Sequence, residues 1–249
     1  MSATPILQLQ GATRRMAGRT IVDGVTLALD LGCVLGLLGV NGAGKSTTLR
    51  MIAGVLAPSA GRVLFDGRDL HEEPDLARRL GYLPETPPLY AELRVDEYLM
   101  FCARLHGLRA ADARKAVDRA IERCGLGEVR RRLCGSLSKG YAQRTGIAQA
   151  IVHDPDLIVL DEPASGLDPV QAASIRELVR ELGRERAVIL STHLLHDVTA
   201  CCTRVAILHG GRLRHDGAVA DLAGDNAHGT SLEKVFFRIA SGDDAQAAA

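Results

Sequence analysis

Hydrophobic and polar positions alternate loosely along the first thirty residues, from Ile6 to Leu29. The alternation is clearest in "ILQLQGA" and "IVDGVTLAL". A period of two is typical of strands with one buried face, so these segments predict antiparallel strands at the start of the domain. The apolar run 31–40 is nearly continuous, which predicts a fully buried strand. A glycine-rich turn follows it, and "KSTTLRMIAGVL" then predicts a helix that ends near Gly54.

The middle of the chain, between Glu85 and Val152, has a different pattern. It follows "GRVLFDGRDL", which predicts a hairpin around Asp66-Gly67. In "YAELRVDEYLMFCARLHGL" and "AADARKAVDRAIERCGL" apolar residues recur at helical spacing, and strand patterns become scarce. This stretch therefore predicts a helical subdomain inserted in an α/β protein.

Strand patterns return at "DLIVLDEP" and "AVILST", with "QAASIRELVRELG" between them. Short apolar runs joined by a crossover helix are typical of a parallel sheet covered on both faces. A last hairpin is predicted at Gly210-Gly211 in "RVAILHGGRLRHDG". After it we expect a short apolar helix, "SLEKVFFRIA", and a disordered end, "SGDDAQAAA".

Composition narrows the class of protein. The chain has 249 residues, and its 30 basic and 30 acidic side chains give a formal net charge of zero. A balanced charge gives poor support for nucleic-acid binding, so no nucleic acid is expected as a partner. The longest apolar run is shorter than the about 20 residues that cross a bilayer, and no signal peptide is visible. We therefore expect a cytoplasmic protein, and any work at a membrane would need another chain to span it.

The cysteines give no sign of a metal site or a disulfide framework. There are six, with no C-x-x-C pair, at Cys33, Cys102, Cys124, Cys134, Cys201 and Cys202. Buried or idle thiols in a reducing compartment are the expected state.

Residues 39–47, "GVNGAGKST", fit the phosphate-loop pattern G-x-x-x-x-G-K-[ST]. Glycines allow the backbone to wrap a β-phosphate with inward N–H groups, while Lys45 bridges β- and γ-oxygens and Ser46 ligates Mg²⁺. The sequence therefore predicts a site for ATP and Mg²⁺. Its candidate nucleotide-binding residues are Gly39, Asn41, Gly42, Ala43, Gly44, Lys45, Ser46 and Thr47.

Two acids end the apolar run in "LIVLDEP". In open α/β sheets ligands lie at the carboxyl ends of the strands, so Asp161 and Glu162 should face the nucleotide. We expect Asp161 to hold Mg²⁺ through water and Glu162 to polarise the attacking water.

A second candidate phosphate site lies in "LCGSLSKGYAQRTGIAQA". Ser138 and Gly140 stand just ahead of a predicted helix with Ile147, Ala148 and Ile151 on one face. The N-terminus of a helix attracts anions through its free N–H groups and its dipole. One nucleotide does not need two such sites.

From about Leu7 to Asp216 the sequence resembles the ATP-binding subunits of ABC (ATP-binding cassette) transporters. "LSKGY" at 137–141 resembles the family signature LSGGQ, "SGLD" resembles its D-loop, and "STH" resembles its switch histidine. The implied fold is α/β: a P-loop NTPase (RecA-like) core with a parallel sheet, an antiparallel N-terminal β subdomain and an inserted helical subdomain. The nucleotide-binding domain would span 1–216, with the core at about 1–84 and 153–216 and the helical subdomain at about 85–152. Residues 217–249 would form a short helix and a disordered tail.

The resemblance explains the second anion site. Family subunits pair head to tail, so ATP on the phosphate loop of one is capped by the signature of the other. The residues implied in that role are Ser138, Lys139, Gly140 and Tyr141, with Asp168 in the D-loop, and the implied catalytic pair is Glu162 and His193. The partners would be a second copy or a related ATPase subunit, together with separate integral membrane permease subunits that hold the pair at the inner face of the cell membrane.

The sequence departs from the family pattern in the signature, where Lys139 adds a positive charge close to the partner's phosphates, and at two further positions. Met16 stands where an aromatic residue usually stacks on adenine, and methionine can pack on a ring through its thioether. Glu85 replaces the glutamine that touches Mg²⁺ and links the site to the permease, and a carboxylate can also ligate Mg²⁺. "GYLPE", "LSKGY" and "SLEKVFFRI" resemble the exporter branch of the family.

The segment Pro84–Tyr90, with Leu93, Tyr98 and Phe101, is predicted to border a groove for a cytoplasmic helix of the permease. Alternatively, the aromatic residues Tyr82, Tyr90, Tyr98 and Phe101 form the small core of the helical subdomain, an interpretation that fits Phe101 best. At the level of function, the alternative is a soluble single-cassette ABC ATPase with an assembly role outside transport. A metabolic kinase would share the phosphate loop but would explain neither "LSKGY" nor the helical insertion.

Overall fold

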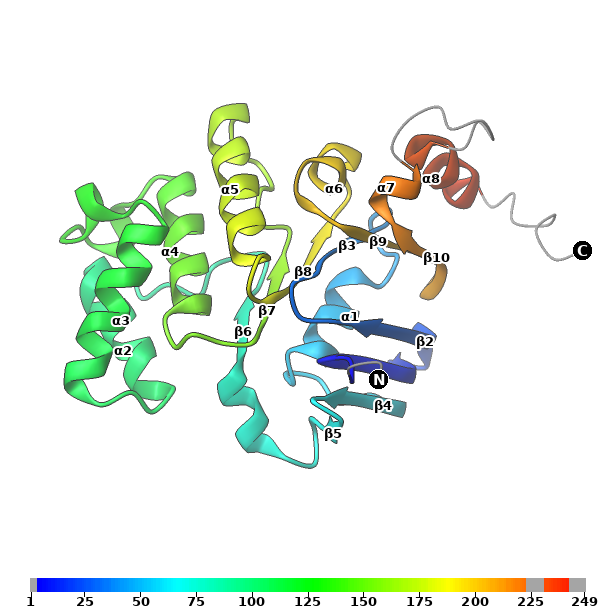
Figure 1. Ribbon diagram of the computed structural model, residues 1–249, viewed down its shortest axis with the longest axis horizontal. Coiled ribbons are helices and arrows are strands. Elements are labelled where there is room, and N and C mark those ends of the chain that lie inside the picture. Colours follow the sequence, from blue (N-terminus) through cyan, green and yellow to red (C-terminus); the bar gives the residue numbers. More distant parts are fainter. Residues whose placement is uncertain (1–3, 223–230, 242–249) are drawn as a thin grey trace, which may run out of the picture.

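The computed structural model describes residues 4–222 and 231–241. They form two sheets flanked by helices (Figure 1). The strands are β1 (Leu7–Met16), β2 (Arg19–Leu29), β3 (Val34–Leu38), β4 (Ala60–Phe65), β5 (Arg68–Asp69), β6 (Leu80–Leu83), β7 (Leu157–Asp161), β8 (Ala187–Thr192), β9 (Arg204–His209) and β10 (Arg212–Ala218). The α-helices are α1 (Lys45–Ile52), α2 (Val95–Leu105), α3 (Ala110–Arg123), α4 (Lys139–Ile151), α5 (Pro169–Leu182), α6 (Leu195–Cys201), α7 (Val219–Leu222) and α8 (Leu232–Ala240).

The N-terminal strands form a four-stranded sheet in the order β2-β1-β4-β5. β1 runs antiparallel to both β2 and β4, and Leu7 lies opposite Leu29 and Phe65. The turn between β4 and β5 places Asp66 and Gly67 at positive φ, 52° and 75°, as a two-residue hairpin turn requires. The predicted antiparallel strands and hairpin are confirmed.

The second sheet has six strands in the order β10-β9-β3-β8-β7-β6. Only β10 pairs antiparallel, and the other neighbours pair in parallel. The two predicted buried runs are β7 and β8, which lie side by side, with α5 as the crossover helix between them. The apolar run 31–40 gives a shorter strand than predicted, because only Val34–Leu38 pairs.

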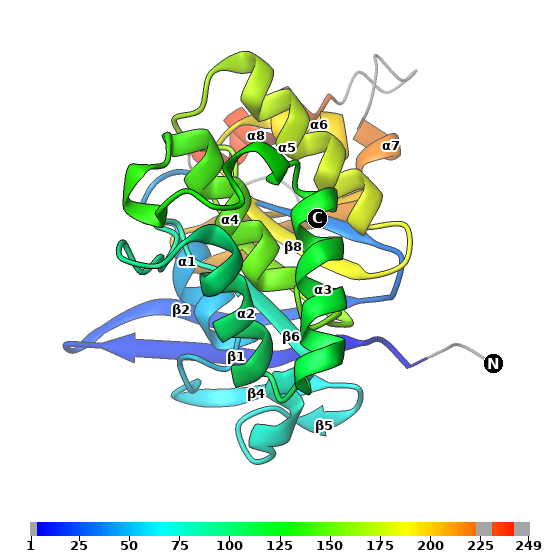
Figure 2. The same ribbon diagram turned by 90° about the vertical axis from the view of Figure 1, so that its left-hand side faces the viewer.

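The strands β3, β7 and β8 are buried on both faces of the six-stranded sheet. Successive side chains of a strand point to opposite faces, so each of these strands contributes to two cores. In β7, Leu157 and Val159 face a core shared with α1 and the four-stranded sheet. Ile158 and Leu160 face a second core shared with α4 and α5. Figures 1 and 2 show α1 between the two sheets and α5 and α6 on the opposite face. Because β3, β8 and β7 pair in parallel, their carboxyl ends lie at the same edge of the sheet.

The predicted helices between 85 and 152 are confirmed as α2, α3 and α4, which pack around a common core. The boundaries proposed for this subdomain remain a prediction. The sequence interpretation missed β6, a four-residue strand that pairs in parallel with β7. Gly81 explains how α4 covers it closely: a Cβ at this position would lie 2.0 Å from the carbonyl oxygen of Ala150.

The last described segments cover the end of the six-stranded sheet. The β9–β10 hairpin and the α8 helix confirm two predictions, whereas α6 and α7 were not predicted. α8 buries Leu232, Val235 and Ile239 in a third core, against residues that include Val205 and Ile207 of β9. The predicted disordered end, apart from Ser241, lies outside the described residues. Among the residues described, no helix is both long and apolar enough to cross a membrane.

Candidate functional site

The glycine-rich loop connects the buried end of β3 to the first turn of α1. Gly44 caps the helix at φ 101°, and a Cβ there would lie 2.9 Å from the carbonyl oxygen of Ile21. A Cβ on Gly39 would lie 2.6 Å from the carbonyl oxygen of Leu208. The loop therefore needs glycine at both ends, at one for its conformation and at the other for space.

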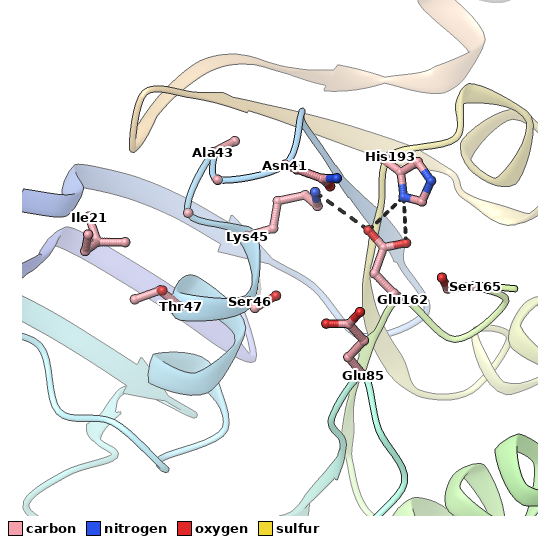
Figure 3. A pocket seen from close by; sticks show the side chains of 12 residues that line it. Ile21, Asn41, Ala43, Lys45, Ser46, Thr47, Glu85, Glu162, Ser165 and His193 are labelled. Atoms are coloured by element: carbon pink, nitrogen blue, oxygen red, sulfur yellow. Dashed lines mark hydrogen bonds and ion pairs between the residues drawn. The ribbon is translucent and has the colours of Figure 1, made fainter.

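The loop borders a cleft of about 430 Å³ (Figure 3). Its lining residues are Ile21, Asn41, Gly42, Ala43, Gly44, Lys45, Ser46, Thr47, Glu85, Glu162, Ser165 and His193. Every predicted nucleotide-binding residue of the loop except Gly39 is in this set. The structure thus brings residues from five separate parts of the sequence to one polar cleft.

Lys45 is a buried cation at the head of α1. Its side chain is 7% exposed, and Nζ donates a hydrogen bond to the carbonyl oxygen of Gly39 at 2.9 Å. Nζ also lies 3.6 Å from Oε1 of Glu162. A buried ammonium beside free backbone N–H groups gives the cleft a positive floor that suits phosphate.

Asp161 ends β7 with a fully buried carboxylate, 1% exposed. Its Oδ1 accepts hydrogen bonds from Ser46 Oγ at 3.1 Å and from Ser191 Oγ at 2.6 Å. Ser191 Oγ also accepts from the backbone N–H of Glu162 at 2.9 Å. The sequence interpretation did not single out Ser191, although it stands in the quoted "STH", at the same strand end as His193.

Glu162 holds a strained place in the cleft. Its φ is +50°, uncommon for a residue with a side chain. The carboxylate is 12% exposed and lies between two nitrogens, Nζ of Lys45 and Nδ1 of His193, the latter 3.0 Å from Oε2. The dashed lines in Figure 3 mark both contacts. This turn of backbone aims the carboxylate into the cleft and not along the strand.

The two unusual positions behave differently. Glu85 points into the cleft between Ser46 and Glu162 (Figure 3). Met16 does not line the cleft: it lies at the end of β1 and is 44% exposed. Ile21, on the neighbouring strand β2, lines it instead. The cleft itself therefore gives no support to a contact between Met16 and the base.

The residues predicted to form a second anion site lie apart from the cleft. Ser138 caps α4, and its hydroxyl accepts from the N–H of Tyr141 at 3.5 Å. The helix begins at Lys139, so Gly140 lies inside its first turn and not ahead of it, which corrects the sequence interpretation. A Cβ on Gly140 would lie 2.6 Å from the side chain of Gln171, the first-turn residue of α5. None of the residues 138–141 lines the cleft beside the glycine-rich loop.

Asp168 caps the other helix of this pair. Its Oδ1 accepts from the N–H groups of Val170 and Gln171, so it closes the first turn of α5. Of the segment "SGLD", it is Ser165 and not Asp168 that reaches the cleft.

A separate aromatic groove of about 490 Å³ lies between the six-stranded sheet and α2. Tyr90 meets Tyr98 and Phe101 edge to face, with ring centroids 6.0 and 5.5 Å apart. Tyr98 is buried, and burial raises the pKa of its hydroxyl well above the ordinary value. Tyr90 and Phe101 are exposed, so the core interpretation is wrong for Phe101 and right for Tyr98. Leu93 packs on the core and does not line the groove.

Known proteins resemble this chain over most of its length. A family model described as "ABC transporter" matches residues 22–165, and one described as "AAA domain, putative AbiEii toxin, Type IV TA system" matches 136–196. The chain is 39% identical over 205 residues to "ABC transporter ATP-binding protein NatA" of Bacillus subtilis (strain 168), covering 81% of this chain and 83% of that protein. It is 34% identical over 211 residues to "Bacitracin transport ATP-binding protein BcrA" of Bacillus licheniformis, covering 84% and 68%. A solved "Structure of ATP binding subunit of ABC transporter" has a TM-score of 0.83 at 30% identity and covers 94% of this chain and 99% of that one.

Proposed function

The chain belongs to the ABC transporter family as an ATP-binding subunit with ATPase activity, and we propose that it drives export through separate transmembrane subunits. In this proposal Mg-ATP is bound between two head-to-tail subunits, and hydrolysis loosens the pair. The observation that carries it is the convergence of Lys45, Glu162 and His193 in one cleft beside the glycine loop. The resemblance of "GYLPE", "LSKGY" and "SLEKVFFRI" to exporter subunits supports the direction of transport.

The donor set fits a nucleotide with its magnesium ion. Ser46 Oγ and Asp161 Oδ1 lie 3.1 Å apart, and Glu85 adds a second carboxylate at the rim of the cleft. Hard oxygen donors of this kind are those that Mg²⁺ prefers. Mg²⁺ would be held by Ser46, with Asp161 acting through water and Glu85 beside it, and would neutralise charge on the phosphates.

Glu162 is the proposed general base. Its carboxylate takes a proton from the attacking water at Oε1 or Oε2, while Nδ1 of His193 holds the carboxylate in place. Lys45 shares the same carboxylate at 3.6 Å in the free chain. A phosphate bound on the loop would draw the Lys45 ammonium toward itself, because a phosphate carries more charge than the carboxylate.

The separation of the first turn of α4 from the cleft supports the head-to-tail pairing of two subunits. Since 138–141 do not line the cleft of their own chain, they can serve a nucleotide on a partner. Ser138, the N–H of Gly140 and the charge of Lys139 would face the partner's phosphates, with the α4 dipole behind them. Tyr141 completes the first turn of α4, and Asp168 fixes the neighbouring turn of α5. Met16 stays a proposed contact to a base that projects beyond the cleft.

The aromatic groove is the proposed binding site for the permease. Pro84, Pro88 and Tyr90 line it, while Glu85, in the same segment, lines the nucleotide cleft. One short segment thus joins the two sites, and this continuity supports its role in transmitting the state of the nucleotide. The exposed rings of Tyr90 and Phe101 offer apolar area to a helix.

The first test uses the Glu162→Gln variant, tagged and recovered from solubilised native membranes with ATP and Mg²⁺. The variant should retain ATP binding and lose turnover by roughly 10²–10⁴-fold, the range typical of a general base. A multi-span membrane protein should be recovered with it in stoichiometric amount, and Tyr90→Ala should abolish that recovery. Recovery of soluble partners only would favour the soluble assembly ATPase, and unchanged hydrolysis would remove Glu162 from its role.

A further inference from the structure

The buried hydroxyl of Thr192 makes hydrogen bonds on both sides of the turn that contains His193. Thr192, at the end of β8, is 1% exposed. Its Oγ1 donates to Oδ2 of Asp197 at 2.8 Å and accepts from the backbone N–H of Leu194 at 3.0 Å. The residues before and after His193 are therefore joined through a single oxygen atom.

The other end of this link is a largely buried ion pair between two helices. Oδ1 of Asp197, on α6, accepts from Nη1 of Arg176 on α5 at 2.9 Å, and the two side chains are 7% and 13% exposed. α5 and α6 lie side by side on the same face of the sheet (Figure 1). The pair thus fixes α6, and through Thr192 the His193 turn, relative to the helix that Asp168 caps.

None of these three side chains lines the nucleotide cleft, whereas His193 does. The ring of His193 is 43% exposed, so packing alone restrains it little. Its 3.0 Å contact with Glu162 then depends on where the backbone turn holds it.

We propose that Thr192 and Asp197 are positioning residues for ATP hydrolysis, and that they set the contact between His193 and Glu162 through the Thr192 hydroxyl. The inference rests on the proposed catalytic role of His193. Arg176 holds Asp197 in the orientation that receives this hydroxyl.

The central experiment compares Thr192→Val with Thr192→Ser in the full-length protein. Valine keeps the shape and removes the hydroxyl, whereas serine restores it. Because misplacing a reacting group by about 1 Å can cost about 100-fold in rate, we expect Thr192→Val to lower kcat by about tenfold or more. KM for ATP should change by less than about twofold, since the residue does not touch the cleft. Thr192→Ser should keep kcat near that of the wild type.

Thr13→Val is the matched control. Thr13, on β1, is also buried, and its Oγ1 accepts the N–H of Gly24 at 2.9 Å. It does not line the cleft, so it should lose stability much as Thr192→Val does, with kcat unchanged. An equal fall of kcat in both variants would reduce the effect to general destabilisation and overturn the proposal. Asp197→Asn, which keeps the volume of the side chain, provides a second variant in case Thr192→Val does not fold.

A double variant tests whether the effect passes through His193. In a His193→Ala background, Thr192→Val should cost less than about a further twofold in kcat. A full additional loss would show that Thr192 acts by another route. The single His193→Ala variant separates the two hypotheses: unchanged hydrolysis there would refute the role of His193 itself, together with everything inferred from it.

Discussion

Mild acid should destabilise this protein through one partly buried histidine, His153, which follows α4. Its ring stacks on His106 with centroids 3.5 Å apart and planes 2° from parallel. Its Nε2 lies 2.9 Å from the carbonyl oxygen of Leu80, an acceptor, so this nitrogen carries the proton of the neutral ring. Burial, and then the charge of His106, lower the pKa of His153 from 6.5 to about 4.

The lower pKa of His153 in the folded chain sets the direction in which stability changes with pH. The unfolded chain binds the proton first, so the contribution of His153 to stability is fully present above pH 6.5 and is lost progressively as pH falls from about 6.5 to about 4. The gap between the two pKa values corresponds to about 3 kcal/mol in the free energy of unfolding. About 2 kcal/mol of this should already be lost at pH 5.

Urea unfolding at pH 7.5 and pH 5.0, followed by circular dichroism, measures this loss. His153→Gln keeps a donor toward Leu80 and cannot take up a proton in this range. The carboxylates contribute equally to both proteins, so the wild type should lose about 2 kcal/mol more than the variant between the two pH values. His196→Gln, at an exposed site on α6, should behave as the wild type does. The same pH dependence in wild type and His153→Gln would refute the reasoning.

Three further outcomes follow from the structure. Lys45→Ala should weaken ATP binding by about tenfold to a hundredfold in titration calorimetry, because a charge-assisted contact is lost; an unchanged Kd would contradict the role of the ammonium. Gly81→Ala should lower the free energy of unfolding by about 1–3 kcal/mol, since its Cβ would overlap α4, whereas Gly127→Ala, with open space around it, should be close to neutral. Ser191→Ala should cost about 1–3 kcal/mol in the same urea experiment, because a buried carboxylate loses its 2.6 Å donor; no loss would mean that another group satisfies it.

Local patterns in the sequence predicted most of the strands and helices of the fold. Alternation found β1 and β2, continuous apolar runs found β7 and β8, and helical spacing found α2 to α5. These elements are long or strongly patterned, so each could be predicted from its own residues alone. β6 and α6 are only four and seven residues long, and nothing within so short a span separates them from a loop. β6 is a strand because β7 pairs with it and α4 covers it.

The candidate site divides in the same way. The phosphate loop was predictable because its conformation is written into adjacent glycines, and the order of motifs implied Glu162 and His193. The sequence did not predict a role for Ser191, because its hydrogen-bond partner, Asp161, lies thirty residues earlier. The two meet only through the parallel register of β7 and β8, in which Asp161 and Ser191 are paired.

The sequence by itself determined the α/β class, the nucleotide loop and the family, because these depend on residue types at fixed local spacing. Tertiary structure alone decided which side chains share the cleft. In the structure Ile21 lines the cleft and Met16 does not, and residues 138–141 lie away from the cleft. Tertiary structure also placed Thr192 between Asp197 and the turn of His193. Distances between segments far apart in the chain are set by how strands pair and helices pack, and a linear pattern does not contain them.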